Sequence, residues 1–287
     1  MSPVAAVTDT TGYLPADVVR DNSIHIVSLY VNFGGERTER EADITDYGRF
    51  FEELRRSEQL PTTSQPAVGD FIGVYEPLLT QDQDIVSVHI SGGLSGTVDA
   101  ARQAAQALEG KGGERVHLFD SETGAGGTGI LALVAARAAQ RGESAEQIME
   151  RLRGARADLK IWFAIDTLEY LRRGGRIGAA SAWIGSTLKI KPILTVEREM
   201  TPVERVRTSK RAFERMVDYA KQRHSSGADA WVVQHIQSPD QAAELTARCT
   251  EIFGTGPLFV SEIGPVLGVH TGPGLLGVGG IPPHWLD

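Results

Sequence analysis

The chain has 287 residues, of which 41% are hydrophobic and 23% are charged, a composition typical of globular proteins that excludes a fibrous or disordered chain. Its formal charge of −8, with no long run of basic residues, disfavours nucleic acid and anionic membranes as partners. This length suits two domains, since one domain commonly holds about 100–200 residues.

Several classes of site are excluded by the residues that the chain lacks. Its single cysteine, Cys249, excludes an internal disulfide and a zinc site of the CxxC type. The seven histidines are widely spaced and form no HExxH motif, so we expect no metal. We expect no other cofactor either. The chain starts without a basic and apolar leader, and no stretch approaches about 18 consecutive apolar residues. We therefore expect a cytoplasmic protein without stable membrane insertion.

The first half of the chain alternates strand-like and helix-like segments, a pattern that predicts a parallel sheet covered by helices. Strands are expected at Val4 to Thr8, Ile24 to Phe33, Asp84 to Ile90, Val116 to Phe119 and Lys160 to Ile165. Helices are expected at Thr45 to Arg56, Ala67 to Leu79, Thr97 to Leu108 and Gly124 to Gln140. The last of these is apolar nearly all round, which indicates a buried helix.

From about residue 160 onward, glycine and proline interrupt shorter elements, and this change predicts a domain boundary. We expect an N-terminal parallel-sheet α/β domain over residues 1–160 and a smaller C-terminal α/β domain over residues 161–287. One helix is expected at Thr208 to Arg223 with Thr208 as its N-cap, and another from Ser238-Pro239 onward. The strands expected here are Ile193 to Val196, Ala230 to His235 and Leu258 to Glu262.

Two polar segments of the first half have both a ligand-binding and a structural interpretation. In Thr8 to Gly12, hydroxyls and the Asp9 carboxylate would bind a ligand or cap the next turn. Pro61 to Pro66 holds three hydroxyls and an amide between two prolines, which stiffen the loop. Thr63 or Ser64 would there meet a ligand or cap the following helix.

The segment from His89 to Thr97 joins a strand to a helix through glycines. The free N–H groups at that helix start, with the hydroxyls of Ser95 and Thr97, suit a carboxylate or a phosphate. A serine-dependent acyl hydrolase is the alternative, because a serine between strand and helix is the geometry of a nucleophile elbow. The residues around Ser95 do not form GxSxG, which weighs against it.

The segment Gly124 to Gly129 matches GxGxxG and lies between an expected strand and an expected helix. A dinucleotide-binding protein is therefore a second alternative. Three residues separate the strand from these glycines, and no acidic residue ends a following strand about 20 residues on. We favour glycines that make room for an apolar ligand or a neighbouring helix. No GxxxxGK[ST] motif occurs, so the sequence predicts no P-loop for ATP.

Two later segments carry side chains that suit an anion. Asp166 to Gly178 begins with an aspartate in a capping position and holds three arginines that would meet an anionic partner or form a solvated turn. His270 lies in a glycine-rich loop, where it would be structural or would hydrogen-bond an anion.

Taken in order, six segments resemble the DegV family, over essentially the whole chain from Val4 to about Gly279. They are Thr8 to Thr11, Thr63 to Pro66, Leu94 to Thr97, Asp166 to Gly178, Lys191 to Leu194 and His270 to Gly274. The chain departs from the usual pattern at Thr10, at Gly92-Gly93 and at Val98-Asp99. These departures concern the neighbourhood of the ligand and hence the preferred chain length.

The resemblance implies a two-domain α/β protein that holds one long-chain fatty acid in a buried tunnel between its domains. It implies that Thr63 and Ser95 hydrogen-bond the carboxylate, with His270 close by, and we expect Thr62, Gly96 and Thr97 to complete the ligand-binding set. Similar proteins present the fatty acid to a separate ATP-dependent fatty acid kinase subunit that forms the acyl phosphate, which associates the family with phospholipid metabolism. The chain would then be a lipid-binding carrier with no catalytic residue of its own.

The resemblance also implies a docking residue for the kinase subunit in the segment Glu204 to Thr208. Arg205 and Arg207 alternate there in an extended stretch, so both side chains are expected on one face. Arg207 is the first choice for the contact with the kinase subunit. A solvated pair of arginines is the structural alternative.

Overall fold

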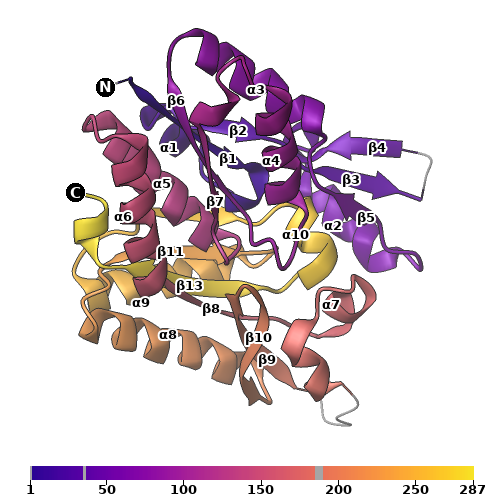
Figure 1. Cartoon of the computed structure of the whole chain (residues 1–287). Helices are drawn as coiled ribbons and strands as arrows, with labels where there is room; N and C mark the ends of the chain where they lie inside the picture. The colour runs from indigo at the N-terminus through magenta and orange to yellow at the C-terminus, as the bar shows by residue number, and fades with distance from the viewer. Residues whose placement is uncertain (1, 35–36, 185–189) are drawn as a thin grey trace.

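The computed structural model describes residues 2–34, 37–184 and 190–287, and its strands form three sheets (Figure 1). The first is a parallel sheet with the order β2-β1-β6-β7. Its strands are β1 (Val4–Asp9), β2 (His25–Val27), β6 (Asp84–His89) and β7 (Val116–Asp120). The expectation of a mixed α/β fold with a parallel sheet is confirmed.

Helices cover both faces of the parallel sheet, as sheets of this kind require. One face packs on α3 (Val68–Thr80) and α4 (Thr97–Ala107), and the other on α5 (Gly126–Gln140) and α6 (Ala145–Asp158). Nearly every side chain of α5 is buried, as its all-round apolar sequence predicts. Helix α5 also packs against strands of the second large sheet, so it lies between the two. A short helix, α1 (Ala16–Asp21), joins β1 to β2.

The second sheet has six strands in the order β10-β9-β8-β13-β11-β12. They are β8 (Lys160–Ala164), β9 (Lys191–Glu197), β10 (Glu199–Val206), β11 (Ala230–His235), β12 (Phe259–Glu262) and β13 (Leu276–Ile281). The strand expected from Lys160 is present as β8, which pairs antiparallel with β9 and β13 and so belongs to the six-stranded sheet. The chain passes from one large sheet to the other between β7 and β8, and a domain boundary at residue 160 stays a prediction.

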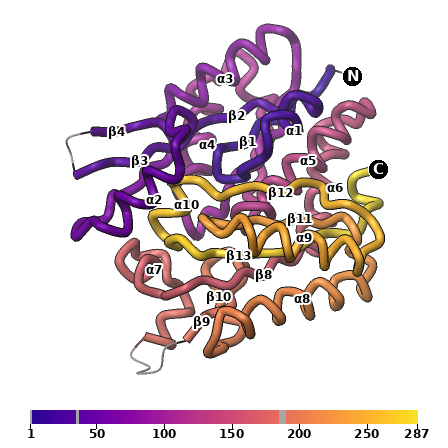
Figure 2. The backbone as a smooth tube through the Cα atoms, turned by 180° about the vertical axis from the view of Figure 1, so that it is seen from behind, coloured from indigo at the N-terminus to yellow at the C-terminus, as the bar shows by residue number. Residues whose placement is uncertain are grey.

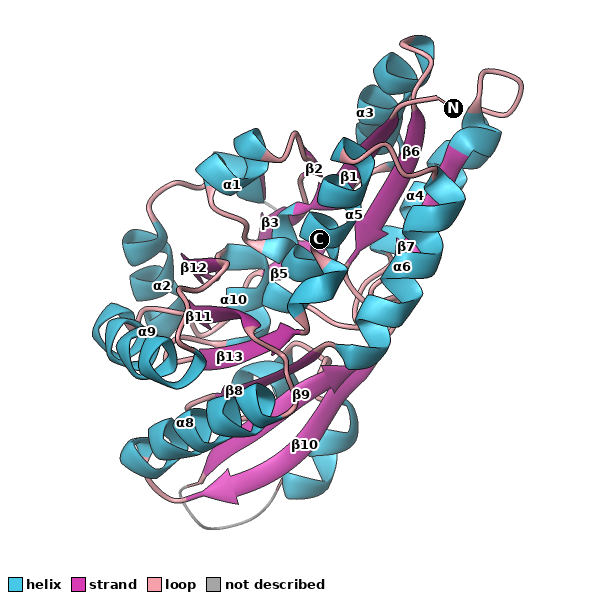
Figure 3. Ribbon diagram, turned by 90° about the vertical axis from the view of Figure 1, so that its left-hand side faces the viewer, coloured by secondary structure: helices cyan, strands magenta, loops and turns pink. Residues whose placement is uncertain are grey.

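Two helices, α8 (Ser209–Ser225) and α9 (Pro239–Phe253), cover the outer face of the six-stranded sheet (Figure 3). The Thr208 hydroxyl accepts a hydrogen bond from Arg211 N at 3.1 Å, which confirms the expected N-cap. Proline begins α9 after Ser238, also as expected.

The third sheet is small and antiparallel, with the order β4-β3-β5. Its strands are β3 (Tyr30–Phe33), β4 (Arg37–Arg40) and β5 (Thr62–Ser64). The expected single strand from Ile24 to Phe33 is therefore wrong. The chain breaks at Ser28 and Leu29, where the Ser28 hydroxyl accepts a bond from Ala42 N and Leu29 N donates to the Thr10 hydroxyl. The α2 helix (Tyr47–Arg56) packs beside this sheet.

Two short helices, α7 (Glu169–Arg173) and α10 (Pro265–Thr271), pack against each other, and α10 also packs against β3 and β5 of the third sheet (Figure 2). Asp166 does not cap α7, because its carboxylate pairs with Lys191 Nζ at 2.5 Å and α7 begins three residues later. His270 lies in α10 and not in a glycine-rich loop. None of the described helices is long and apolar enough to cross a membrane.

Candidate functional site

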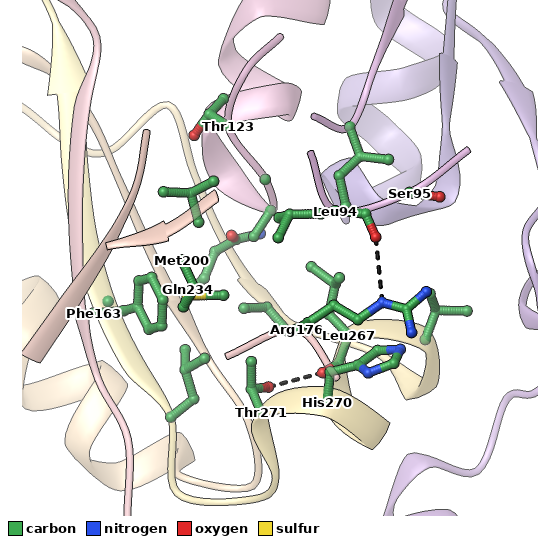
Figure 4. Close-up of a pocket in the computed structure, with 18 of the residues that line it drawn as sticks. Leu94, Ser95, Thr123, Phe163, Arg176, Met200, Gln234, Leu267, His270 and Thr271 are labelled. Carbon is green, nitrogen blue, oxygen red and sulfur yellow. Dashed lines mark hydrogen bonds between the residues drawn. The ribbon is translucent and has the colours of Figure 1, made fainter. Parts of the chain in front are cut away.

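A mostly apolar cavity lies between the two large sheets and is closed on one side by α10. It measures about 1040 Å³ when the space at its open end is included. Its apolar wall includes Ile90, Ile161, Phe163, Met200, Val232 and Val278. In Figure 4, Ser95, Arg176 and His270 gather at one end, while Phe163 and Met200 lie across the cavity from them. The end that carries the three polar residues is called the head end below.

Thr63 and His270 meet at the head end, although 207 positions separate them in the sequence. The Thr63 hydroxyl oxygen and His270 Nε2 are 2.7 Å apart. Thr63 lies in β5, where it is paired with Val31 of β3, and it lines the cavity. The expectation that Thr63 or Ser64 caps the next helix is wrong, because Ala67 is the N-cap of α3.

His270 is neutral at pH 7 in this environment. Burial, and then the nearby positive charge of Arg176, lower the pKa of the imidazole to about 4. A neutral imidazole has one N–H group, which lies on either ring nitrogen. In the tautomer with the proton on Nε2, this nitrogen donates to the Thr63 oxygen, and the Thr63 hydroxyl proton is free to be donated into the cavity.

Ser95 reaches the head end from the turn between β6 and α4. Its backbone N–H donates to Ser91 O at 3.1 Å, and its hydroxyl lies 2.8 Å from the hydroxyl of Thr97. Thr97 is fully buried and does not line the cavity, nor does Gly96. A Cβ atom on Gly96 would lie 3.1 Å from the Gln65 side chain, so this glycine lets Gln65 approach. Gly96 and Thr97 thus support the wall from behind.

Thr62 lies outside the cavity, because successive residues of a strand face opposite sides. It is exposed and lines a surface depression together with Asn32 and Arg173. Thr63, Arg176 and His270 line both this depression and the cavity. The head end is therefore close to the protein surface.

Arg176 is the site residue whose position was not expected. The sequence singled it out only as one of three arginines that suit an anion, and the structure brings it to the cavity. Its Nε donates to Leu94 O at 3.4 Å and its Nη1 to Gly174 O at 2.9 Å. A guanidinium at the end of an apolar cavity favours an anionic ligand group there. Ser64 and Gln65 of the proline-bracketed segment also line the cavity.

The geometry gives no support to a serine hydrolase. The Ser95 hydroxyl is bonded to Thr97, and the histidine of the cavity is bonded to Thr63. An aspartate, a histidine and a serine do form a chain elsewhere: His89 Nδ1 is 3.0 Å from Asp9 Oδ2, and its Nε2 is 2.7 Å from Ser87 Oγ. These three side chains are at most 1% exposed and line no described cavity, so no substrate reaches them.

The glycines of Gly124 to Gly129 serve close packing at the start of α5. Gly126 N donates to the Gln234 side chain, so that amide is not free for a pyrophosphate. A Cβ atom would lie 2.6 Å from Thr123 Oγ1 at Gly127, and 2.9 Å from Gly12 O at Gly129. The geometry therefore does not favour the dinucleotide alternative. In the described ranges, no three His, Cys, Asp or Glu side chains are placed to hold a metal ion.

Comparison with known proteins agrees with this fold over nearly the whole chain. A family model described as uncharacterised protein, DegV family, matches residues 3–282. Protein DegV of Bacillus subtilis is 34% identical over 96% of this chain and 98% of its own length. A DegV domain-containing protein of Streptomyces coelicolor is 38% identical over 96% of this chain and 97% of its own length.

Solved structures give the same relationship. A DegV family protein from Thermus thermophilus, described by its fatty acid binding, is 33% identical, with a TM-score of 0.86 over 98% of this chain and 99% of that one. DegV from Bacillus subtilis, described as a fatty acid binding protein, is 34% identical, with a TM-score of 0.86. The match covers 97% of this chain and 99% of that one. The chain therefore belongs to the DegV family.

Proposed function

We propose that this protein binds one long-chain fatty acid, with the alkyl chain in the cavity and the carboxylate at the head end. The observation that carries the proposal is an apolar cavity that ends in the side chains of Thr63, Ser95, Arg176 and His270. Each buried methylene contributes about 0.8 kcal/mol, so a long alkyl chain supplies ample free energy of binding. The two solved DegV proteins described above as fatty acid binders support the same ligand.

Burying a carboxylate costs free energy unless hydrogen-bond donors replace the lost water. The head end provides such partners. Thr63 and Ser95 supply hydroxyl groups, and the contact with His270 Nε2 holds the Thr63 hydroxyl in place. Arg176 supplies a positive charge at the same end. A neutral His270 adds no charge of its own at pH 7, so the balance of charge depends on Arg176.

The carboxylate is then presented to a separate, ATP-dependent fatty acid kinase subunit, which forms the acyl phosphate. Two observations support this second part of the proposal. The chain has no P-loop motif, and its head end adjoins a surface depression through Thr63, Arg176 and His270. The protein itself acts as a carrier and not as the enzyme.

Protein purified from a bacterial host should contain about one fatty acid per chain, because transfer of the alkyl chain from water into the apolar cavity is favourable. Mass spectrometry of the intact protein under native conditions, and of its organic extract after denaturation, measures the content. A nucleotide in the extract would favour the dinucleotide alternative. Well-folded protein that carries no lipid and takes up none when a fatty acid is added would contradict the proposal.

We further propose that Arg207 contacts the kinase subunit, with Arg205 beside it. Both side chains are exposed at the end of β10 while Val206 between them is buried, so both face outward. The Arg205 guanidinium lies 5.2 Å from the centre of the Trp183 ring, whereas Arg207 follows the strand. Arg207 is thus the freer of the two to meet a partner.

Replacing Arg207 by alanine should leave the fold and the lipid content unchanged while phosphorylation by the kinase subunit falls steeply. Lys210→Ala, a change to an exposed cation three residues further on, is the matched control. Phosphorylation of the bound fatty acid and lipid content are measured in parallel. A loss of lipid along with activity would place Arg207 at the cavity. Unchanged activity would make it surface charge only and move the search to Arg172, Arg173 and Arg176.

A further inference from the structure

The first turn of α10 is capped by side chains from a distant part of the chain. Its own N-cap residue, Gly264, has no side chain to offer. Instead, Val266 N donates to Glu41 Oε1 at 2.7 Å, and Leu267 N donates to the Tyr13 hydroxyl at 3.1 Å. The Tyr13 hydroxyl in turn donates to Glu41 Oε1 at 2.8 Å. Two first-turn amides, which a helix leaves without internal partners, are satisfied in this way.

The same helix forms one side of the fatty acid cavity. Val266, Leu267, His270 and Thr271 of α10 all line it. His270 follows Val266 by four residues, so both lie on one face of the helix. The helix is thus held at its start by Glu41 and Tyr13 and near its end by the contact between His270 and Thr63.

We propose that Glu41 is a positioning residue which, together with Tyr13, fixes α10 and thereby the place of His270 at the head end of the cavity. The effect on fatty acid affinity rests on the proposed function, whereas the placement of His270 does not. Glu41 does not itself line the cavity and acts through Val266 and Leu267 of the helix that it caps.

The Glu41 carboxyl titrates at an unusual pH, which gives a way to measure this role. Its side chain is 2% exposed, and its Oε2 atom is buried without a hydrogen-bond partner among the described residues. Burial is the main cause that raises the pKa of this carboxyl to about 7, and the negative charge of Asp9 acts in the same direction. The other titratable groups near the Glu41 carboxyl are the phenols of Tyr13 and Tyr47, and Glu262 lies near Tyr47. The pKa of both phenols is raised, so the two tyrosines stay neutral near pH 7.

Three variants separate positioning from general stability. Glu41→Ala removes the acceptor, whereas Glu41→Gln keeps an oxygen for Val266 N and Tyr13. Tyr13→Phe removes only a hydroxyl and is the second test if Glu41→Ala does not fold. Tyr75→Phe is its matched control, because Tyr75 is fully buried, bonds Ser87 at 2.8 Å and lines no part of the cavity.

The affinity of delipidated protein for palmitate is measured by titration calorimetry. We expect Glu41→Ala and Tyr13→Phe to weaken binding about tenfold or more, as loss of a buried hydrogen bond does. Glu41→Gln at pH 6 should bind within about threefold of the wild type, and Tyr75→Phe should lower the melting temperature without changing affinity. Equal affinity in all variants, or an equal loss in Tyr13→Phe and Tyr75→Phe, would overturn the proposal.

A second measurement needs no ligand and therefore tests the placement of His270 even if the wild type binds no fatty acid. The ring resonances of His270 are followed by NMR in delipidated protein as the pH is varied. In the wild type we expect a main step near its own pKa of about 4 and a smaller step near pH 7 from Glu41. The smaller step should vanish in Glu41→Gln and persist in Tyr75→Phe. A step near pH 7 that survives in Glu41→Gln, or ring resonances of His270 that are the same in Glu41→Ala as in the wild type, would refute the positioning role.

Discussion

Removing both hydroxyl donors of the head end, in the double variant Thr63→Ala/Ser95→Ala, is expected to abolish tight fatty acid binding. Each single change should cost roughly 1–3 kcal/mol, the usual penalty for leaving a charged acceptor without its donor. The two changes act on one carboxylate, so their effects need not add. The double variant should nevertheless bind at least about a hundredfold more weakly than the wild type. Affinity for palmitate and the lipid content of the purified protein measure the effect.

Thr62→Ala is the matched control for this experiment. It removes the same hydroxyl from the neighbouring residue of β5, which is exposed and lines the outer depression. Its affinity should equal that of the wild type. If Thr62→Ala weakens binding as much as Thr63→Ala, the carboxylate lies in the depression and not in the cavity. Full affinity in the double variant would place the carboxylate at another part of the wall.

Much of the fold can be predicted from local patterns of apolar and polar residues along the chain. The strands β1, β6 and β7 are short apolar runs followed by polar turns, and the helices between them have clear apolar faces. By contrast, β13 was not predicted, because Gly277, Gly279 and Gly280 give it the composition of a loop. The structure explains these glycines: a Cβ at Gly279 would lie 2.4 Å from Lys160 O, and one at Gly280 would lie 2.4 Å from Ala230 O. Close approach of β8 and β11 requires glycine there.

Local sequence patterns predict the site less well than they predict the fold. Thr63 and His270 come from elements far apart in the sequence, and only the resemblance to a family placed them together. The sequence around His270 predicts a loop, since α10 is short and is followed by Gly272 and Gly274, which both have positive φ angles. The place of Arg176 depends on the turn after α7, which no periodicity predicts. Such tertiary contacts need the structure.

Filling the cavity at Gly124 is expected to change the preferred length of the fatty acid. Gly124 lines the cavity, and a Cβ atom there would meet only the side chains of Ile90 and Leu94 at 3.9 Å, an ordinary contact. Gly124→Leu would place four carbon atoms in space that the alkyl chain otherwise occupies. At about 0.8 kcal/mol per methylene, palmitate should lose about 3 kcal/mol of binding free energy. Fatty acids shorter by about four carbons should lose much less.

The comparison of chain lengths separates a filled cavity from a damaged fold. Gly124→Ala adds only the tolerated Cβ and should bind palmitate nearly as the wild type does. Gly127→Ala would force a Cβ to 2.6 Å from Thr123 Oγ1, so it should lower the melting temperature and weaken binding of every fatty acid alike. If Gly124→Leu also weakens short and long fatty acids equally, the alkyl chain does not pass Gly124. A preference that shifts toward shorter chains at an unchanged melting temperature would show that this glycine borders the path of the alkyl chain.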